Sequence, residues 1–196
     1  MSRTRVIFDR NQIIDIAFAI VKEEGSEALS SRRVCKELNV SSMTIYNYVG
    51  SMDEIKREVV LKIFDVMYRR IFVELKENRA LGKDNASLAK ALAMSIFDFA
   101  CENPNLFLFL YTEQAKFHND AEVRQFYKFY TYFQPKGKAQ RNQRDENRRV
   151  ALLYEHTVIS LIHEHIWKVN VLTREEYAEC VAMYVDRVIS YPLAKE

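Results

Sequence analysis

The stretch LSSRRVCKELNVSSMTIYNYVGSMDEI, residues 29–55, carries the pattern that decides the fold. The paired serines at 30/31 and at 41/42 can cap two short helices, the first through Leu38 and the second through Tyr48. Two short helices joined by a three-residue turn form a helix-turn-helix. The apolar residues that can hold these helices against a preceding helix are Val34, Leu38, Val40, Ile45 and Val49.

The outward face of the second short helix is polar and free of acids. Hydroxyls, an amide and one apolar tip suit phosphates, base edges or thymine methyl groups. No acidic residue occurs between Asn39 and Met52, so this face does not repel phosphate. At this point a helical hairpin without a nucleic-acid role remains an open alternative. The outward set is Ser42, Met43, Thr44, Tyr46, Asn47 and Tyr48.

The same stretch resembles the DNA-binding domain of the TetR (tetracycline-repressor-type) family of bacterial regulators. The residues that match the family pattern are Leu29-Ser30-Ser31-Arg32, Val34-Cys35, Leu38, Val40-Ser41, Thr44-Ile45-Tyr46 and Val49. A preceding helix from Ile13 to Gly25 matches the family's first helix. The resemblance implies a helix-turn-helix domain over 1–52 and a helical effector-binding and dimerisation domain over 53–196. It also implies a homodimer that binds a DNA operator.

The resemblance transfers DNA contacts to individual positions. Ser31 and Arg32 match the opening of the second helix, where Arg32 could read guanine or contact the backbone. The matched recognition-helix positions are Ser42, Met43, Thr44, Tyr46, Asn47 and Tyr48. Three residues depart from the pattern: Asn39 replaces a turn glycine, Tyr48 a histidine and Met52 a phosphate-anchoring lysine. The last change puts the strength of operator binding in doubt.

The remainder of the 196 residues predicts long helices, because 4 Gly and 3 Pro leave few breaks. The box Ser51–Glu54 can cap a helix that runs to about Asn78. Residues 134–144 hold no large apolar side chain and predict a loop. With no strand pattern, the expected architecture is all-α, with about nine helices. The other expected helices cover about 84–101, one or two within 106–133 broken near 118–120, 145–170 and 173–190.

Aromatic residues concentrate after the first 60 positions, where 20 of the 24 occur. Such density suits a helical domain around an apolar ligand cavity, as the resemblance implies, although plain core packing explains most single residues. The pocket candidates are Phe97, Phe109, Tyr111, Phe126, Tyr127, Tyr130, Tyr154 and His163.

The last two predicted helices each carry a one-sided apolar stripe. Two such helices can pair with their copies in a four-helix dimer interface, or pack within the monomer. The interface candidates are Leu152, Ile159, Tyr177, Val181, Tyr184 and Val188.

The net charge of +2 taken alone disfavours nucleic acid, but the position of the charges matters more. Arg3, Arg5 and Arg10 can form a basic arm that reaches phosphate or the minor groove. The three separate cysteines suit a reducing compartment. Without a secretory signal or a membrane-spanning run, we expect a cytoplasmic protein with no membrane partner.

We find no enzyme or cofactor motif. The segment 163–165 is His-Glu-His, but side chains two apart point to different sides of a helix, so we expect no metal site. The expected function is a DNA-binding regulator, most simply a repressor released from a palindromic operator by a small apolar or aromatic effector. The alternatives are a helical interaction or adaptor module that lacks operator binding, and an activator or ligand-insensitive regulator.

Overall fold

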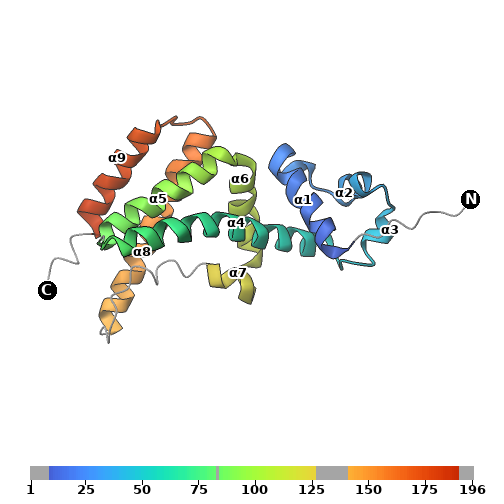
Figure 1. The fold of residues 1–196 in the computed structure, drawn as a ribbon, viewed down its shortest axis with the longest axis horizontal. Coiled ribbons are helices and arrows are strands. Elements are labelled where there is room, and N and C mark those ends of the chain that lie inside the picture. Colours follow the sequence, from blue (N-terminus) through green and yellow to red (C-terminus); the bar gives the residue numbers. More distant parts are fainter. Residues whose placement is uncertain (1–8, 83, 127–140, 190–196) are drawn as a thin grey trace, which may run out of the picture. The chain divides into compact units, whose positions relative to one another are not determined.

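The computed structural model describes residues 9–82, 84–126 and 141–189 (Figure 1). Over these ranges the chain contains helices and turns and no strand, which confirms the all-α prediction. The nine α-helices within these ranges are α1 (Arg10–Glu24), α2 (Ser31–Leu38), α3 (Ser42–Ile45), α4 (Met52–Ala80), α5 (Asn85–Glu102), α6 (Pro104–Glu113), α7 (Ala121–Phe126), α8 (Arg141–Ile166) and α9 (Arg174–Tyr184). Short 3₁₀ turns cover Ser26–Ala28 and Gln114–Phe117, and a π-helical turn covers Val185–Ile189.

The helices form two compact units. The N-terminal unit contains the residues up to Asp65 together with Asn103–Val123, and the C-terminal unit contains Val66–Glu102 and the chain from Arg124 onward. The boundary falls inside α4, so this one helix contributes residues to both units. The domain division predicted after residue 52 stays a prediction.

The N-terminal unit is built on α1. Its buried face includes Ile13, Ala17 and Val21, and α6 packs beside it. Gly25 ends α1 with φ of +87°, a conformation that favours glycine, as expected from the sequence. The amide of Asn105 donates to the carbonyl of Lys22 at 3.0 Å, which joins the first turn of α6 to the last turn of α1.

Local capping sets the helix-turn-helix boundaries. The hydroxyl of Ser30 accepts the N–H of Arg33, and Ser41 caps α3 in the same way. Asn39 ends α2 with φ of +54° and ψ of +45°, the left-handed conformation that asparagine tolerates.

The predicted end of the third helix at Tyr48 is wrong, because α3 ends at Ile45. The N–H groups of Asn47 and Tyr48 donate to Thr44 and Ile45, three residues back, so the chain tightens into a turn. Residues 44–48 have low intrinsic helix propensity, and this turn leads directly to the buried Val49.

The start of α4 departs slightly from the predicted capping box. The hydroxyl of Ser51 accepts the N–H of Glu54 at 3.1 Å, as expected. The Glu54 carboxylate, however, accepts the N–H of Gly50 at 2.7 Å. The Glu54 carboxylate of the capping box therefore accepts from Gly50, one residue earlier than the predicted Ser51, in the loop between α3 and α4.

In the C-terminal unit, aromatic side chains from two helices pack on α5. The hydroxyl of Tyr154 on α8 donates to the carbonyl of Ala89, and that of Tyr177 on α9 donates to the carbonyl of Ala93. Tyr177 also stacks on Phe97, with ring centroids 4.3 Å apart. Small residues on α5 thus give the rings access to the helix backbone.

The C-terminal helices correct three predicted boundaries. Residues 141–144 belong to α8 and are not a loop, while residues 134–140 lie outside the described part. α8 ends at Ile166, four residues before the predicted end at Asn170, and Lys168, two residues further on, adopts φ of +58°. α9 gives way to the π-helical turn after Tyr184. Within the described ranges, none of the helices is both long enough and apolar enough to span a bilayer.

Candidate nucleic-acid interface

The helix-turn-helix of α2 and α3, which we call the reading motif, is anchored on one side by buried apolar side chains. Val34 of α2 and Ile45 of α3 are fully buried, and Val49 is almost so. Leu38 and Val40 are half-buried. This one-sided anchoring leaves the opposite side of α3 to solvent, as the spacing of the apolar residues predicts.

The predicted contact residues lie on the surface of the N-terminal unit to different degrees. Met43 is 81% exposed, Tyr46 42% and Tyr48 43%. Ser42, Asn47 and Arg32 are exposed as well. Ser31 and Thr44 are half-buried. All eight residues belong to α2, α3 and the turn after α3.

Internal contacts engage the hydroxyl groups of α3. The Oγ of Ser41 lies 2.8 Å from the Oγ1 of Thr44, and the same Ser41 oxygen accepts the N–H of Thr44. The Sγ of Cys35 donates to the Oγ of Ser42 at 3.6 Å. These contacts stabilise the first turn of α3, which has only four residues.

Two neighbouring arginines of α2 differ in their availability. Arg33 bonds Glu24 of α1 at 2.6 Å and also pairs with Glu37. The hydrogen bonds that Arg33 donates to Glu24 and then to Glu37 raise the pKa of Arg33, and the bond from Arg33 lowers the pKa of Glu24. Arg32 has no hydrogen bond or ion pair to any residue that the structure describes. Its guanidinium therefore remains available for a partner outside the described residues.

The prediction that Arg10 belongs to a free basic arm is wrong. Its guanidinium donates to Glu54 at 2.9 and 3.2 Å and to Glu58 at 2.9 Å. The hydrogen bonds that Arg10 donates to Glu58 and then to Glu54 raise the pKa of Arg10. Arg10 thus pairs with α4, while Arg3 and Arg5 lie outside the described residues.

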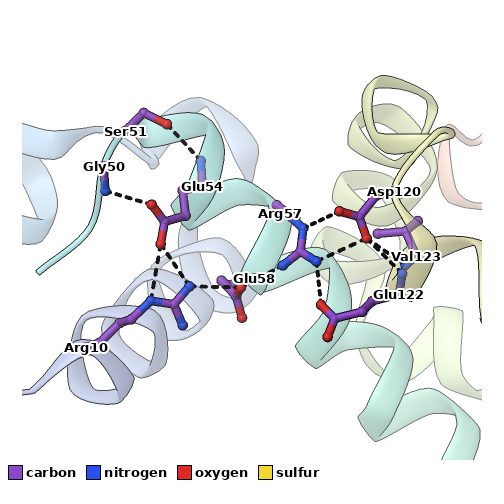
Figure 2. A network of polar contacts seen from close by, with 9 residues as sticks. All are labelled: Arg10, Gly50, Ser51, Glu54, Arg57, Glu58, Asp120, Glu122 and Val123. Atoms are coloured by element: carbon purple, nitrogen blue, oxygen red, sulfur yellow. Dashed lines mark hydrogen bonds and ion pairs between the residues drawn. The ribbon is translucent and has the colours of Figure 1, made fainter.

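A polar network continues from these residues to the start of α7 (Figure 2). Arg57 of α4 pairs with Glu58 beside it and, on the other side, with Asp120 and Glu122. Asp120 also accepts the N–H groups of Glu122 and Val123, at 3.0 and 3.1 Å, so it caps α7. The hydrogen bond from Arg57, followed by that from Val123, lowers the pKa of Asp120 to about 2.

A second ionic cluster joins α4 to the end of α6. Glu113 is only 5% exposed and accepts hydrogen bonds from Lys56 at 3.2 Å and from Lys116 at 2.8 and 3.0 Å. Burial alone raises the pKa of Glu113, but the bonds from Lys116 and Lys56 outweigh it, and the pKa falls. Sequence reasoning missed both clusters, because a charged residue on a helix looks the same whether it is paired or solvated.

The predicted pocket residues are divided between the two compact units. Phe109 and Tyr111 belong to the N-terminal unit, whereas Phe97, Tyr154 and His163 belong to the C-terminal unit. The side chain of Phe126 and all of Tyr127 and Tyr130 lie outside the described part.

The two histidines of the segment 163–165 have separate neighbours. His163 stacks on Trp167 at 4.9 Å. His165 packs against Phe97 at 5.1 Å and lies 3.6 Å from the sulfur of Cys101. Among the described residues, no group of three or more metal-ligating side chains gathers there or elsewhere.

The predicted dimer stripe lies partly inside its own unit. Tyr177, Val181 and Ile159 are buried in the single chain, and Tyr184 is half-buried. For Tyr177 and Val181 the structure supports the alternative of packing within the monomer. Leu152 is exposed, and the side chain of Val188 lies outside the described part. The exposed apolar residues that the prediction missed on these helices and their connection are Leu153, Trp167, Val169, Val171 and Met183.

Comparison with known sequences gives one partial likeness. No model of a known protein family matches the chain. It is 26% identical over 103 residues to an uncharacterised HTH-type transcriptional regulator, YobS, of Bacillus subtilis (strain 168). The match covers 53% of this chain and 51% of that protein, so the chain spans about half the length of its curated relative.

Comparison with solved structures covers almost the whole chain. A transcriptional regulator from Rhodococcus sp. RHA1 has a TM-score of 0.67 at 16% identity, over 92% of this chain and 95% of that one. The multidrug-binding protein EbrR, solved with imidazole, has a TM-score of 0.62 at 14% identity, over 89% and 93%. A TetR-family member from Streptomyces coelicolor A3 has a TM-score of 0.60 at 17% identity, over 89% and 96%. These likenesses show the fold.

Proposed function

We propose that this chain, whose fold is the TetR-like fold, is a DNA-binding transcriptional regulator that inserts α3 into the major groove. One observation carries the proposal: Met43, Tyr46 and Asn47 are exposed at α3 and the turn after it, and Arg32 of the neighbouring α2 has no partner among the described residues. No acidic residue interrupts the segment from Asn39 to Met52. Such a face can approach phosphates and base edges without a charge penalty.

The regulator acts as a homodimer. In a two-fold dimer, two copies of α3 enter successive major grooves ~34 Å apart or a multiple of this distance, and the operator is then palindromic. The exposed apolar residues Leu152, Leu153 and Met183 on α8 and α9 support an interface on these two helices. The buried members of the predicted stripe, Ile159, Tyr177 and Val181, then pack within the monomer beneath the interface.

A small effector controls DNA binding. The aromatic-rich C-terminal unit supports an apolar or aromatic effector, and the related fold of EbrR belongs to a multidrug-binding protein. Because α4 contributes to both units, an effector that prefers one position of α4 shifts the population of DNA-competent dimers. We assign the regulator to the repressors on this basis.

The competing candidate is an interaction module that kept the scaffold without operator binding. Two observations favour it. Met52 supplies no phosphate-anchoring charge, and Arg10 and Arg33 are already paired with carboxylates of this chain. DNA binding is favoured by Arg32, which has no partner among the described residues, and by the absence of acidic residues from Asn39 to Met52.

Footprinting on the DNA upstream of the gene tests the proposal. At low salt we expect a protected palindrome, and Arg32→Ala combined with Tyr46→Ala should abolish it while the dimer persists in size-exclusion chromatography. Lys76→Ala, which removes an equal charge from an exposed position in the C-terminal unit, serves as the control. Wild-type protein that leaves every duplex unprotected, yet captures protein partners, would establish the interaction module instead.

A further inference from the structure

The side chains of α3 differ in how freely they can meet DNA. The hydroxyls of Ser42 and Thr44 already bond Cys35 and Ser41 within the N-terminal unit. Met43 lies between them and is 81% exposed, the highest value among the large apolar side chains that the structure describes. The thioether of Met43 is therefore the most exposed apolar group in the first turn of α3.

Met43 belongs to a surface with mixed apolar and amide character. Tyr46, the C-cap residue of α3, and Asn47, in the turn after α3, follow it by three and four positions. Both are exposed, and no described residue forms a hydrogen bond with the side-chain amide of Asn47. We call Met43, Tyr46 and Asn47 the reading patch.

The reading patch carries no charge, which limits the bases that it can recognise. The commonest specific contact to guanine is a bidentate bond from arginine or lysine, and α3 has neither. Arg33, near α3 in sequence, is held by Glu24 and Glu37. Arg32 is the unpaired arginine of α2 that remains for guanine.

Thymine and adenine offer the complementary groups. In the major groove thymine presents a C5-methyl group, against which an apolar tip packs, and adenine presents N6 and N7, which an amide side chain bonds with two hydrogen bonds. A methionine and an unpaired asparagine four positions apart match this pair of groups.

We propose that the reading patch selects A·T base pairs, with Met43 against a thymine methyl group and Asn47 on adenine N6 and N7. This inference rests on the proposed DNA-binding function and adds the base composition of the operator half-site. Recognition of G·C pairs then falls to α2, where Arg32 has no partner among the described residues.

The test starts from a pool of random duplexes, from which wild-type protein is used to select binding sequences. In the selected duplex, each thymine is replaced in turn by uracil, which removes only the methyl group. Because burial of one methyl group stabilises a contact by about the transfer energy of one CH₂, we expect an affinity loss of about fourfold at one thymine per half-site. Met43→Ala should bind the thymine and uracil duplexes equally.

The adenine contact has its own readout. Asn47→Ala should lose the preference for adenine at one position, by about five- to 150-fold against other bases. Leu81→Ala truncates an exposed apolar residue of the C-terminal unit that lies outside α8 and α9, and it should keep the wild-type response to uracil.

Three results would overturn the inference, and they do so in two different ways. If wild-type protein enriches a sequence whose affinity does not change with any uracil, or if Met43→Ala keeps the uracil effect, the patch does not read thymine and the regulator stands. If no duplex is enriched even at low salt, the DNA-binding function fails and the inference with it.

Discussion

Arg57 of α4 and Asp120, which caps α7, form a two-bond ion pair across 63 positions of sequence, with Nε–Oδ2 of 2.7 Å and Nη2–Oδ1 of 3.0 Å (Figure 2). Through Glu58, Arg10 and Glu54, the same network reaches the backbone N–H of Gly50 behind the reading motif. The loop after the reading motif and the α6–α7 corner are therefore connected by side chains within one compact unit.

Loss of this pair should destabilise the N-terminal unit. Arg57→Gln removes a charged, partly buried partner of Asp120, and we expect the free energy of unfolding to fall by about 1–3 kcal/mol in urea. Arg174→Gln breaks a two-bond pair with Asp98 of similar geometry but greater exposure, and should cost at most about 1 kcal/mol. Equal losses in the two variants would contradict the importance of the Arg57 network.

The Asp120 pair should make stability depend on acid pH. The pKa of Asp120 is about 2 in the folded chain against 3.8 ordinarily, because Arg57 stabilises the carboxylate. The stabilisation is present above pH 3.8 and is lost as the pH falls towards 2. In urea unfolding, the difference in the free energy of unfolding between wild type and Asp120→Asn should become smaller as the pH falls from 3.8 to about 2. A gap that stays constant from pH 5 to the acid limit would refute the assignment.

The two arginines of α2 should affect DNA binding unequally. Arg32→Ala removes an unpaired guanidinium, and we expect affinity for the selected duplex to fall by about five- to 150-fold if Arg32 reads a guanine. Arg33→Ala removes a cation already paired with Glu24 and Glu37, so it should change affinity by less than about threefold. Fluorescence anisotropy at fixed salt measures both, and a larger loss in Arg33→Ala would reverse the assignment.

A lysine at position 52 should strengthen the contact with DNA. Met52 opens α4 and carries no charge. Met52→Lys adds a phosphate contact, so we expect higher affinity and a slope of log K against log salt that steepens by about 0.9. Met52→Leu keeps the position neutral and should leave the slope unchanged. An unchanged slope in the lysine variant would show that position 52 does not face phosphate in this protein.

The left-handed residue between α2 and α3 should tolerate glycine and resist alanine. Asn39 has φ of +54°, where a Cβ clashes unless a short polar side chain compensates. Asn39→Ala should cost about 1 kcal/mol, whereas Asn39→Gly should be close to neutral. Thermal unfolding of the two variants compares them directly, and equal melting temperatures would argue against strain at this position.

Much of the helix-turn-helix is predictable from neighbouring residues. Ser30, Ser41 and Ser51 cap helices whose first N–H groups lie three positions ahead, and Gly25 and Asn39 end helices through their own conformations. Such interactions are local, so their partners can be found along the chain. The end of α3 was predicted wrongly, because tertiary packing of Val49 outweighs the weak local preference.

The candidate site is predictable only in part. Spacing correctly places Met43, Tyr46 and Asn47 outward from the buried Ile45. It places Arg10 in a free arm, where the structure pairs it with Glu54 and Glu58, 44 and 48 positions away. Burial of Tyr177 and Val181 is likewise a property of the whole C-terminal unit, since an apolar stripe looks the same on an interface and in a core.

The sequence by itself determined the helical class, the reading motif and the side of α3 that faces outward, because helical periodicity and capping act over three or four residues. Only the tertiary structure decided which charges are engaged: Arg33 by Glu24, Arg10 by α4, and Arg57 by Asp120, with Arg32 left unpaired. The physical reason is that an ion pair depends on distance in space, and helix packing, not sequence separation, sets that distance.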